Sequence, residues 1–249
     1  VSPVFHGGYQ RTMVGAGMLA GALVNRQAGS SITIQNVSAS GSVVTNALMA
    51  GGLIGYCGSP AIIDGTPFGK PARITVKGCN VSGVTVKASS IFGGFIGFGY
   101  ADAITIEDCK ASGITLAATG PQYSGKLWNY VTNQGIECGV GGIIGTVYQS
   151  SLNINGITLE KLDLSIPSGE VGAKSGLGGI VGSMDANGDG SLTNITMGGA
   201  IKIYGDGSTN NPAVGGLIGI LRNDNTTAAQ FTISGVNIAT ADGSTLSQR

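Results

Sequence analysis

A five-residue pattern of glycine and hydrophobic residues recurs along this chain, and it constrains the fold more than any other feature. The clearest copy, GGLIG, occupies Gly51–Gly55. Close copies lie at Gly93–Gly97, Gly141–Gly145, Gly178–Gly182 and Gly215–Gly219, and a degenerate copy, GALVN, lies at Gly21–Asn25. The stretches between copies differ in length, so the pentad is a fixed element joined by variable loops. A repeated element of this kind indicates an array of similar structural units.

A second pattern follows the pentads: two apolar residues separated by one residue, repeated every five residues. Three copies keep it throughout, at Ile74, Val76, Cys79, Val81, Val84 and Val86, at Ile104, Ile106, Cys109, Ala111, Ile114 and Leu116, and at Leu152, Ile154, Ile157, Leu159, Leu162 and Leu164. Shorter copies begin at Ile32 and Phe231, and a copy near Leu192 slips by one residue before Ile201. An apolar pair spaced i, i+2 has the period of a strand and not of a helix. The pattern therefore predicts three very short strands per copy, each with two inward side chains, separated by corners.

A unit built in this way cannot bury its apolar face alone, but stacked units close a continuous core. We therefore predict an all-β fold, a parallel β-solenoid (β-helix) of about six irregular rungs with variable loops, in which the rungs are spaced about 4.8 Å apart. Residues 1–249 are expected to form this single domain. Residues 1–20 would form an N-terminal cap or pairing segment, 21–241 the six rungs and 242–249 a C-terminal tail.

The pentad is interpreted as a strand whose two faces are both apolar. The residue before the pentad and its fourth residue, such as Phe92 and Ile96, would share the inward face, and the third residue, such as Phe95, would point to the other face. A strand that is covered on both sides shows this pattern. Loops, a neighbouring sheet or a partner molecule would then cover the outward face.

The pentad, followed by a stretch such as ITIEDCKASGITL from Ile104, resembles the GLUG repeat family. That family occurs in secreted and cell-surface proteins of bacteria, including large adhesins and the non-catalytic regions of some surface peptidases. The resemblance covers Gly21 to about Ala241, and the pentad at Gly21 departs from it at its second and fifth positions. It implies an extracellular or cell-surface location, and the family motif is structural, so it carries over no catalytic residue.

Charge and hydropathy argue against two classes of partner. The chain has 13 basic and 13 acidic side chains, so its formal net charge is zero and no basic footprint for nucleic acid is indicated. The longest apolar run, Met13–Val24, is too short to span a bilayer, which needs about 20 residues. We expect neither nucleic-acid binding nor membrane insertion.

Two pentads, within Gly139–Gly145 and Gly176–Gly182, look like nucleotide-binding fingerprints. Such a fingerprint needs a strand before it, a helix after it and an acidic residue about 20 positions further on. Helical periodicity is absent downstream of both. The repetition of the pentad along the chain indicates architecture instead of phosphate binding.

The stretch DANGDG begins at Asp185 and matches the front half of a calcium-binding loop. Asp185, Asn187 and Asp189 would supply oxygen ligands, and the glycines would permit the sharp turn. The twelfth position of the loop is Thr196, so the usual bidentate glutamate is missing. The alternative is an ordinary turn, because Asp, Asn and Gly favour turns for backbone reasons. Calcium is the only cofactor that the sequence suggests.

The longest insertion, Ala117–Cys138, carries the only tryptophan of the chain, Trp128, together with Tyr123 and Tyr130. Aromatic side chains on an exposed loop can stack on sugars or anchor a protein partner. The insertion is therefore a candidate ligand-binding site for a glycan or for a host or neighbour-cell protein. The alternative is a loop whose aromatic side chains fold back over the flank of the solenoid.

Cys79 and Cys109 occupy the same position in adjacent copies of the second pattern, so they should face inward and stack. Their separation would fall in the range that a disulfide can bridge. Two buried thiols that behave as small hydrophobic side chains are an equal alternative. Cys57 and Cys138 flank pentads that lie two copies apart, and the sequence does not pair them.

The case for an enzyme is thin. Neither G-x-S-x-G nor H-E-x-x-H occurs, and Glu107, Asp108, Glu160 and Asp163 fall on predicted outer faces. We therefore predict a non-enzymatic extracellular adhesin-type or structural module that binds glycan or protein at a bacterial surface. One alternative is a self-assembling filament or surface-layer subunit, because solenoid ends are sticky unless capped. Another is a polysaccharide-cleaving β-helix enzyme or a phage tail-spike-like domain, which would need two carboxylates about 5–9 Å apart in a cleft.

Overall fold

The computed structural model describes most of the chain from residue 15 to residue 248. The described ranges are 15–24, 29–45, 47–58, 71–88, 90–118, 138–166, 175–205, 212–222 and 229–248, with four short strands at Ile62–Ile63 (β7), Thr66–Pro67 (β8), Leu127–Asn129 (β15) and Gln134–Ile136 (β16). These residues form an all-β structure that contains no helix within the described ranges. β7 with β8 and β15 with β16 form two small antiparallel pairs, and the remaining strands pair in parallel.

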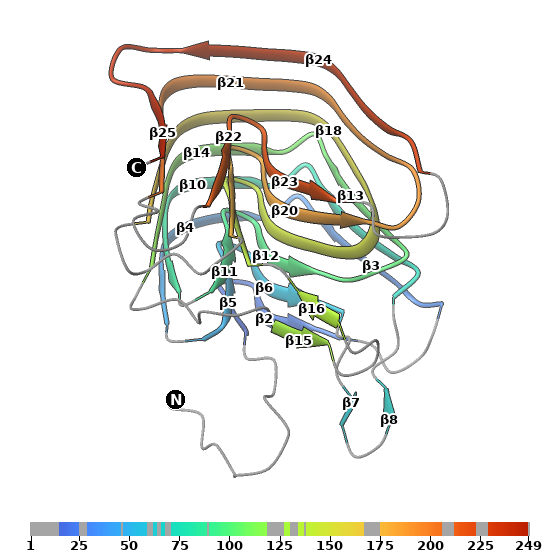
Figure 1. The fold of residues 1–249 in the computed structure, drawn as a ribbon. Coiled ribbons are helices and arrows are strands. Elements are labelled where there is room, and N and C mark those ends of the chain that lie inside the picture. The colour runs from blue at the N-terminus through green and yellow to red at the C-terminus, as the bar shows by residue number, and fades with distance from the viewer. Residues whose placement is uncertain are drawn as a thin grey trace.

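One sheet, which we call sheet A, contains six strands of three residues. They are β1 (Gly15–Gly17), β5 (Met49–Gly51), β11 (Ile91–Gly93), β17 (Gly139–Gly141), β19 (Gly176–Gly178) and β22 (Ala213–Gly215). Their order in the sheet is their order in the chain. These strands lie in the centre of the view in Figure 1.

The second sheet has 15 strands and is strongly curled, so we describe it in two parts, sheets B and C. Sheet B contains β2 (Ala20–Leu23), β6 (Ile54–Cys57), β12 (Ile96–Gly99), the first part of β18 (Ile144–Ile166), β20 (Val181–Ala186) and β23 (Ile218–Arg222). Sheet C contains β3 (Ser31–Gln35), β4 (Ser38–Val44), β9 (Arg73–Lys77), β10 (Asn80–Ala88), β13 (Ala103–Glu107), β14 (Lys110–Ala118), the rest of β18, β21 (Gly190–Gly205), β24 (Phe231–Thr240) and β25 (Thr245–Gln248). Six successive segments of the chain thus each contribute strands to sheets A, B and C in that order.

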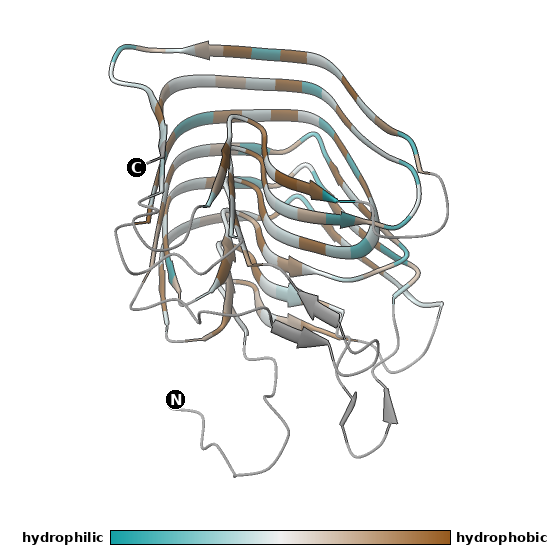
Figure 2. Ribbon diagram, viewed as in Figure 1, coloured by the Kyte–Doolittle hydropathy of each residue, from teal (hydrophilic) through white to brown (hydrophobic). Residues whose placement is uncertain are grey.

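The core lies inside this curl and confirms the second sequence pattern. Every inward position of its three full copies, from Ile74, Ile104 and Leu152 onward, is at most 1% exposed. Parallel pairing brings equivalent positions together, as in Ile104 with Ile74 and Ile104 with Leu152. Figure 2 shows hydrophobic and hydrophilic residues alternating along these strands, as expected where one face is buried and the other is solvated.

Left-handed residues explain why the pattern has a period of five. At the first corner of sheet C, φ lies between 53° and 68° in all six segments, at Asn36, Gly78, Asp108, Gly156, Asn194 and Gly235. At the second corner, φ lies between 59° and 71° at Gly83, Gly113, Lys161 and Gly199. Each corner adds one residue after a stretch of four, and the backbone turns there without changing which face points inward.

The slip near Leu192 is also confirmed, and its cause is an extra residue in β21. Glu160 pairs with Gly198, but Leu162 pairs with Ile201, so two residues of β21 stand opposite Lys161. After this bulge the inward pattern resumes. At the end of the chain, β25 pairs with β21, so the predicted C-terminal tail contains a strand of sheet C.

The interpretation of the pentad as one strand with two apolar faces is wrong. A strand of sheet A ends at the first glycine, the chain bends at the second and third residues, and a strand of sheet B begins at the fourth residue. Because the chain turns between two sheets, Phe92, Phe95 and Ile96 all lie in the same buried cluster. The third residues of the pentads therefore do not form an outward apolar face.

The three glycines of the pentad allow this corner to pack against neighbouring backbone. A Cβ atom on Gly93 would overlap the carbonyl oxygen of Ile96, and one on Gly94 would overlap the carbonyl oxygen of Gly142 in the next segment. A Cβ atom on Gly97 would lie 2.6 Å from the carbonyl oxygen of Ala50. Glycine is required because the backbones approach more closely than any side chain permits.

The first pentad lies at Gly17–Gly21, and the prediction of a copy at Gly21–Asn25 is wrong. Gly17 pairs with Gly51 and Ala20 with Ile54, which places Met18 at the second glycine position. The Cε atom of Met18 lies 3.7 Å from the Cβ position of Gly41, whereas in the next segment Val84 Cγ1 lies 3.2 Å from the Cβ position of Gly52. In the first segment the large side chain, Met18, comes from the pentad and the glycine, Gly41, comes from sheet C. In the next segment the pentad supplies Gly52 and sheet C supplies the large side chain, Val84. This exchange makes the first pentad hard to recognise in the sequence. The strand set also begins at Gly15, within the predicted N-terminal cap.

Candidate functional site

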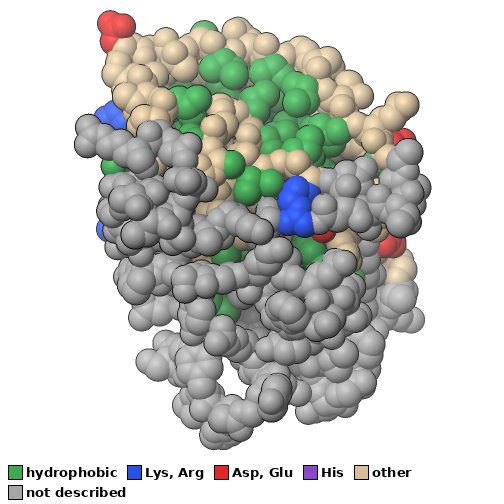
Figure 3. Space-filling view, in the orientation of Figure 1, with side chains coloured by type: hydrophobic (Ala, Val, Ile, Leu, Met, Phe, Trp, Pro, Cys, Tyr) green, Lys and Arg blue, Asp and Glu red, His purple; other side chains and the backbone are tan. Residues whose placement is uncertain are grey.

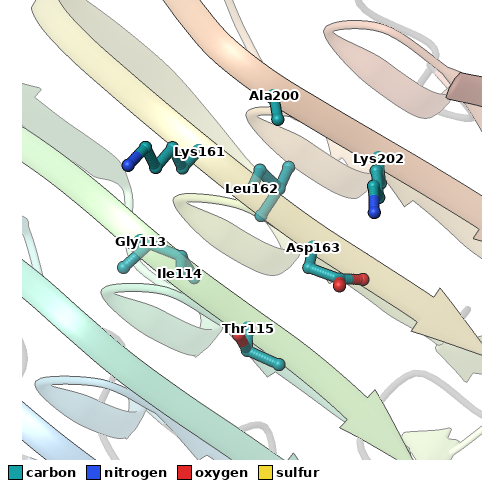
Figure 4. Close-up of a pocket in the computed structure, with 8 residues that line it drawn as sticks. All are labelled: Gly113, Ile114, Thr115, Lys161, Leu162, Asp163, Ala200 and Lys202. Carbon is teal, nitrogen blue, oxygen red and sulfur yellow. The ribbon is translucent and has the colours of Figure 1, made fainter. Parts of the chain in front are cut away.

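A shallow hollow of about 190 Å³ lies on sheet C and crosses β14, β18 and β21 (Figure 4). Its lining residues are Gly113, Ile114, Thr115, Lys161, Leu162, Asp163, Ala200 and Lys202. The hollow follows the second corner, where two local features remove bulk from the surface. Gly113 has no side chain, and the bulge of β21 places the small residue Ala200 beside Lys161.

Three polar side chains of the hollow come from adjacent strands at matched positions. Thr115 pairs with Asp163, and Asp163 pairs with Lys202. The buried Ile114 and Leu162 alternate with them, so the three polar side chains face outward. Together with the ammonium group of Lys161, they offer donors and acceptors for a polar ligand. Figure 4 shows Asp163 and Lys202 next to one another and Lys161 on the other side of Leu162.

The carboxylates considered for catalysis lie on the outer face of sheet C. Glu107 Oε1 is 3.0 Å from Lys77 Nζ, and Asp108 Oδ2 is 3.8 Å from the same atom. The hydrogen bond and the charge of Glu107 raise the pKa of the Lys77 ammonium. Glu160 and Asp163 are both exposed. The structure therefore places these groups on an open surface, in keeping with their predicted positions.

The predicted aromatic site falls largely outside the described residues. Tyr123 and Tyr130 are not described, and Trp128 is described only as part of β15, where its backbone pairs with Gly135 of β16. Ligand binding by these aromatic residues stays a prediction, as does their packing against the flank.

A second buried cluster, which the sequence patterns did not predict, contains Met49, Ile91, Phe98, Cys138 and Tyr148. Met49 and Ile91 alternate with core residues along sheet A, so they point away from the main core. The rings of Phe98 and Tyr148 stack with centroids 6.5 Å apart, and Tyr148 lies 6.0 Å from the ring of Tyr100.

Two partly buried tyrosines border this second cluster. Burial raises the pKa of Tyr56 and of Tyr100, and Tyr148 and Asp102 add to the shift at Tyr100. Alternate apolar residues in sheet A are the sequence signal that could have revealed the cluster.

The three candidate calcium ligands lie at the corner between sheets B and C. Asp185 is in β20, Asn187 donates its backbone N–H to Ser150 O at 3.2 Å, and Gln230 donates its backbone N–H to Asp189 Oδ1 at 2.8 Å. Gly188 has a φ of 103°, as a tight turn requires. Among the described residues, no three His, Cys, Asp or Glu side chains gather to hold a metal. Calcium binding by Asp185, Asn187 and Asp189 stays a prediction.

Cys79 and Cys109 face one another in adjacent segments as buried free thiols. The backbone N–H of Cys79 donates to Cys109 Sγ at 3.3 Å, and Cys109 Sγ donates to the carbonyl oxygen of Glu107 at 3.2 Å. Burial is the main cause that raises the pKa of Cys109 to about 11, and burial raises that of Cys57 to about 12. The arrangement agrees with the thiol alternative, and a disulfide stays a prediction. Cys57 and Cys138 are also buried, and they belong to different clusters.

No family model, curated protein or solved structure matches this chain. The resemblance to the GLUG repeat family therefore stays a prediction. Within the described part of the chain, there is no helix with the length and apolar character needed to cross a membrane.

Proposed function

We propose that this chain is a parallel β-solenoid of six turns that works as a non-enzymatic, extracellular adhesin-type module. Six successive segments pair in parallel in all three sheets, which supports the solenoid. A stacked scaffold of this kind offers a long surface whose outward side chains vary freely, because the inward ones alone form the core. The extracellular setting rests on the resemblance to the GLUG repeat family.

We infer a binding function from the hollow on sheet C. Asp163 and Lys202 are exposed and lie beside Thr115 in register across three strands, with Lys161 at the corner. The hydroxyl groups of a glycan can donate to a carboxylate and accept from ammonium groups. The open surface around these carboxylates supports binding more than cleavage, because glycosidic cleavage needs a carboxylate pair enclosed in a cleft.

Screening the purified chain on a glycan array would test the proposal. We expect retention of a polar glycan, and we expect Lys202→Ala and Asp163→Ala each to weaken it at least tenfold. Lys87→Ala is the matched control, because Lys87 is an exposed lysine on β10 that does not line the hollow.

Equal binding by Lys202→Ala, Asp163→Ala and the parent chain would rule out the hollow as the site. Trp128→Ala should be tested on the same array, because a loss of binding only in this variant would move the site to the insertion. Release of new reducing ends from the bound glycan would contradict the non-enzymatic proposal.

A further inference from the structure

Among the described residues, no strand pairs with the outer side of the first or the last strands of the sheets, and several apolar side chains there are exposed. Sheets A, B and C begin with β1, β2, β3 and β4 and end with β22, β23, β24 and β25. An edge strand presents one row of backbone donors and acceptors that can pair with another strand. We call these two surfaces the N-terminal edge and the C-terminal edge.

The C-terminal edge exposes apolar side chains whose partners in the preceding segment are buried. Ile233 is 49% exposed and Ile238 is 47% exposed, whereas their partners in β21, Leu192 and Met197, are 0% exposed. Leu221 and Leu246 at the same edge are 46% and 57% exposed. Figure 3 shows hydrophobic side chains gathered over β22, β23 and β24.

Charged residues commonly protect sheet edges, but the described residues of the N-terminal edge and the C-terminal edge include very few. The described N-terminal residues 15–24 and 29–45 include none, and the described C-terminal residues 212–222 and 229–248 include only Arg222 and Asp242. The interior segment around β13, by contrast, carries Asp102, Glu107, Asp108 and Lys110 within nine residues. Natural proteins usually place lysines and other charges on exposed edges to prevent pairing.

The corner residues indicate what fits the C-terminal edge. Along the stack the first corner reads Asn36, Gly78, Asp108, Gly156, Asn194 and Gly235, so Asn or Asp alternates with Gly. Each Asn or Asp side chain fills the space above the next glycine: the Cβ positions of Gly78, Gly156 and Gly235 lie 2.7–2.8 Å from the Oδ1 atoms of Asn36, Asp108 and Asn194. If the alternation continues, the residue that follows Gly235 is Asn or Asp. Asn36, the first corner residue of a second copy, fits this position.

Side-chain size matches in the same way. The last strand of sheet B presents Ile218 and Ile220, and the first presents Ala20 and Ala22 at the equivalent positions. In sheet C, β24 would bring the exposed Ile233 next to Ile34 of an incoming β3. The large residues of one edge thus meet small or apolar residues of the other.

We propose that copies of this chain stack head to tail, with the C-terminal edge of one copy pairing with the N-terminal edge of the next. The contact joins two different surfaces and does not close on itself, so it generates an open polymer. Each copy would add six strand layers, or about 29 Å at the spacing of about 4.8 Å between strands. This inference goes beyond the proposed adhesin function and does not depend on it.

The methyl group added by Gly216→Ala tests the contact between two copies. The Cβ position of Gly142 overlaps the carbonyl oxygen of Gly179 in the next segment, whereas that of Gly216 meets only Ile238 Cδ1, at 4.0 Å, because β22 and β23 are the last strands of the described sheets. Gly216→Ala is therefore accommodated in one copy, but its methyl group would meet the carbonyl oxygen of Met18 in a following copy.

Sedimentation over a concentration series and electron microscopy would measure polymer formation. We expect rods from the parent chain and at least a tenfold lower polymer fraction from Gly216→Ala and from Ile233→Lys with Ile238→Lys. Thr232→Gln with Asn237→Gln is the control, because these exposed residues lie on the same strand between the apolar positions and the substitutions add no charge to the edge, so this variant should still polymerise.

Circular dichroism would confirm that every variant keeps its strands. A parent chain that stays monomeric at high concentration would overturn the proposal, and it would mean that residues of the same chain cover the edges. A closed dimer that does not grow, or undiminished polymers of Gly216→Ala, would overturn head-to-tail stacking as well.

Discussion

At the scale of single residues, the first corner of sheet C combines backbone strain with side-chain contact. All six corner residues have positive φ, a conformation in which Gly is free of steric cost and Asn and Asp are tolerated. Their alternation has a packing reason, because each Asn or Asp oxygen occupies the space that a side chain on the next glycine would need. A side chain at Gly78, Gly156 or Gly235 would therefore collide with the Asn or Asp of the preceding segment.

Gly156→Ala should destabilise the fold more than Gly83→Ala. Both positions have a left-handed backbone, which costs a non-glycine residue about 1–2 kcal/mol. Only Gly156 also has a neighbour in the way, Asp108 Oδ1 at 2.8 Å from the Cβ position, whereas nothing lies within 4 Å at Gly83. Urea unfolding should therefore show an additional loss of about 1 kcal/mol or more for Gly156→Ala.

A double-mutant cycle would identify the source of that difference. Asp108→Gly should remove the additional cost of Gly156→Ala, because the two residues contact one another. Equal losses for Gly156→Ala and Gly83→Ala would show that the alternation has no energetic role.

The buried thiols should make the fold sensitive to alkaline pH. Burial raises the pKa of Cys57 to about 12, whereas an unfolded thiol ionises near about 8.5. The folded state therefore holds the proton more tightly, so this contribution to stability is complete below about pH 8.5 and is lost as the pH rises toward 12.

Unfolding free energies measured across this range should fall, and Cys57→Ala should flatten the decline. Thiol titration of the unfolded protein without reductant should give four free thiols. Two missing thiols would support the disulfide between Cys79 and Cys109 instead.

Residue patterns revealed much of the fold because inward positions of short strands must be apolar wherever they lie. That rule placed Val76, Cys109 and Leu164 in the core correctly. It failed at the pentad, because a run of apolar residues does not show a backbone bend. It also failed at Met18, which occupies the position of the second pentad glycine while Gly41 occupies that of the facing large residue. The hollow was not predicted, since it depends on the bulge at Ala200 and on three strands that are distant in sequence.

At the scale of elements, the pentad is the joint between sheets A and B. Its second glycine faces the next segment on one side and the core on the other, as Gly142 does between Gly179 and Leu159. The lengths of the strands follow from this joint: the sheet A strands are short because the chain turns immediately after the first glycine.

Gly142→Ala should be the more damaging of two matched substitutions. Its methyl group would collide with the carbonyl oxygen of Gly179, and relieving this contact would require two segments to separate. Forcing extra volume into a packed interior typically costs about 1–3 kcal/mol and occasionally more. Gly216→Ala, at the same pentad position in the last segment, should be nearly neutral in the monomer.

Thermal unfolding of both variants at low concentration would measure the difference. A stable Gly142→Ala variant would contradict the role assigned to the second glycine.

At the scale of the whole molecule, the core, the hollow and the two edges lie on different sides of the strands. Inward side chains form one continuous core through all six segments, and outward side chains on sheet C form the polar hollow. The described residues at the two edges include exposed apolar side chains and few charges. The binding proposal and the stacking proposal therefore use different surfaces. A polymer would repeat the hollow along its length and increase avidity for an extended ligand.

Distances between spin labels would measure whether the six segments stack in parallel, as the proposed solenoid requires. Thr33, Asn153, Ser191 and Thr232 lie at one matched outward position of sheet C, and the native cysteines are buried. Double electron–electron resonance from Thr33 to the other three, in samples diluted with unlabelled protein, should give distances between label attachment points of about 14, 19 and 24 Å, which follow from steps of about 4.8 Å. Distances that do not increase in this order would contradict the stacked parallel arrangement.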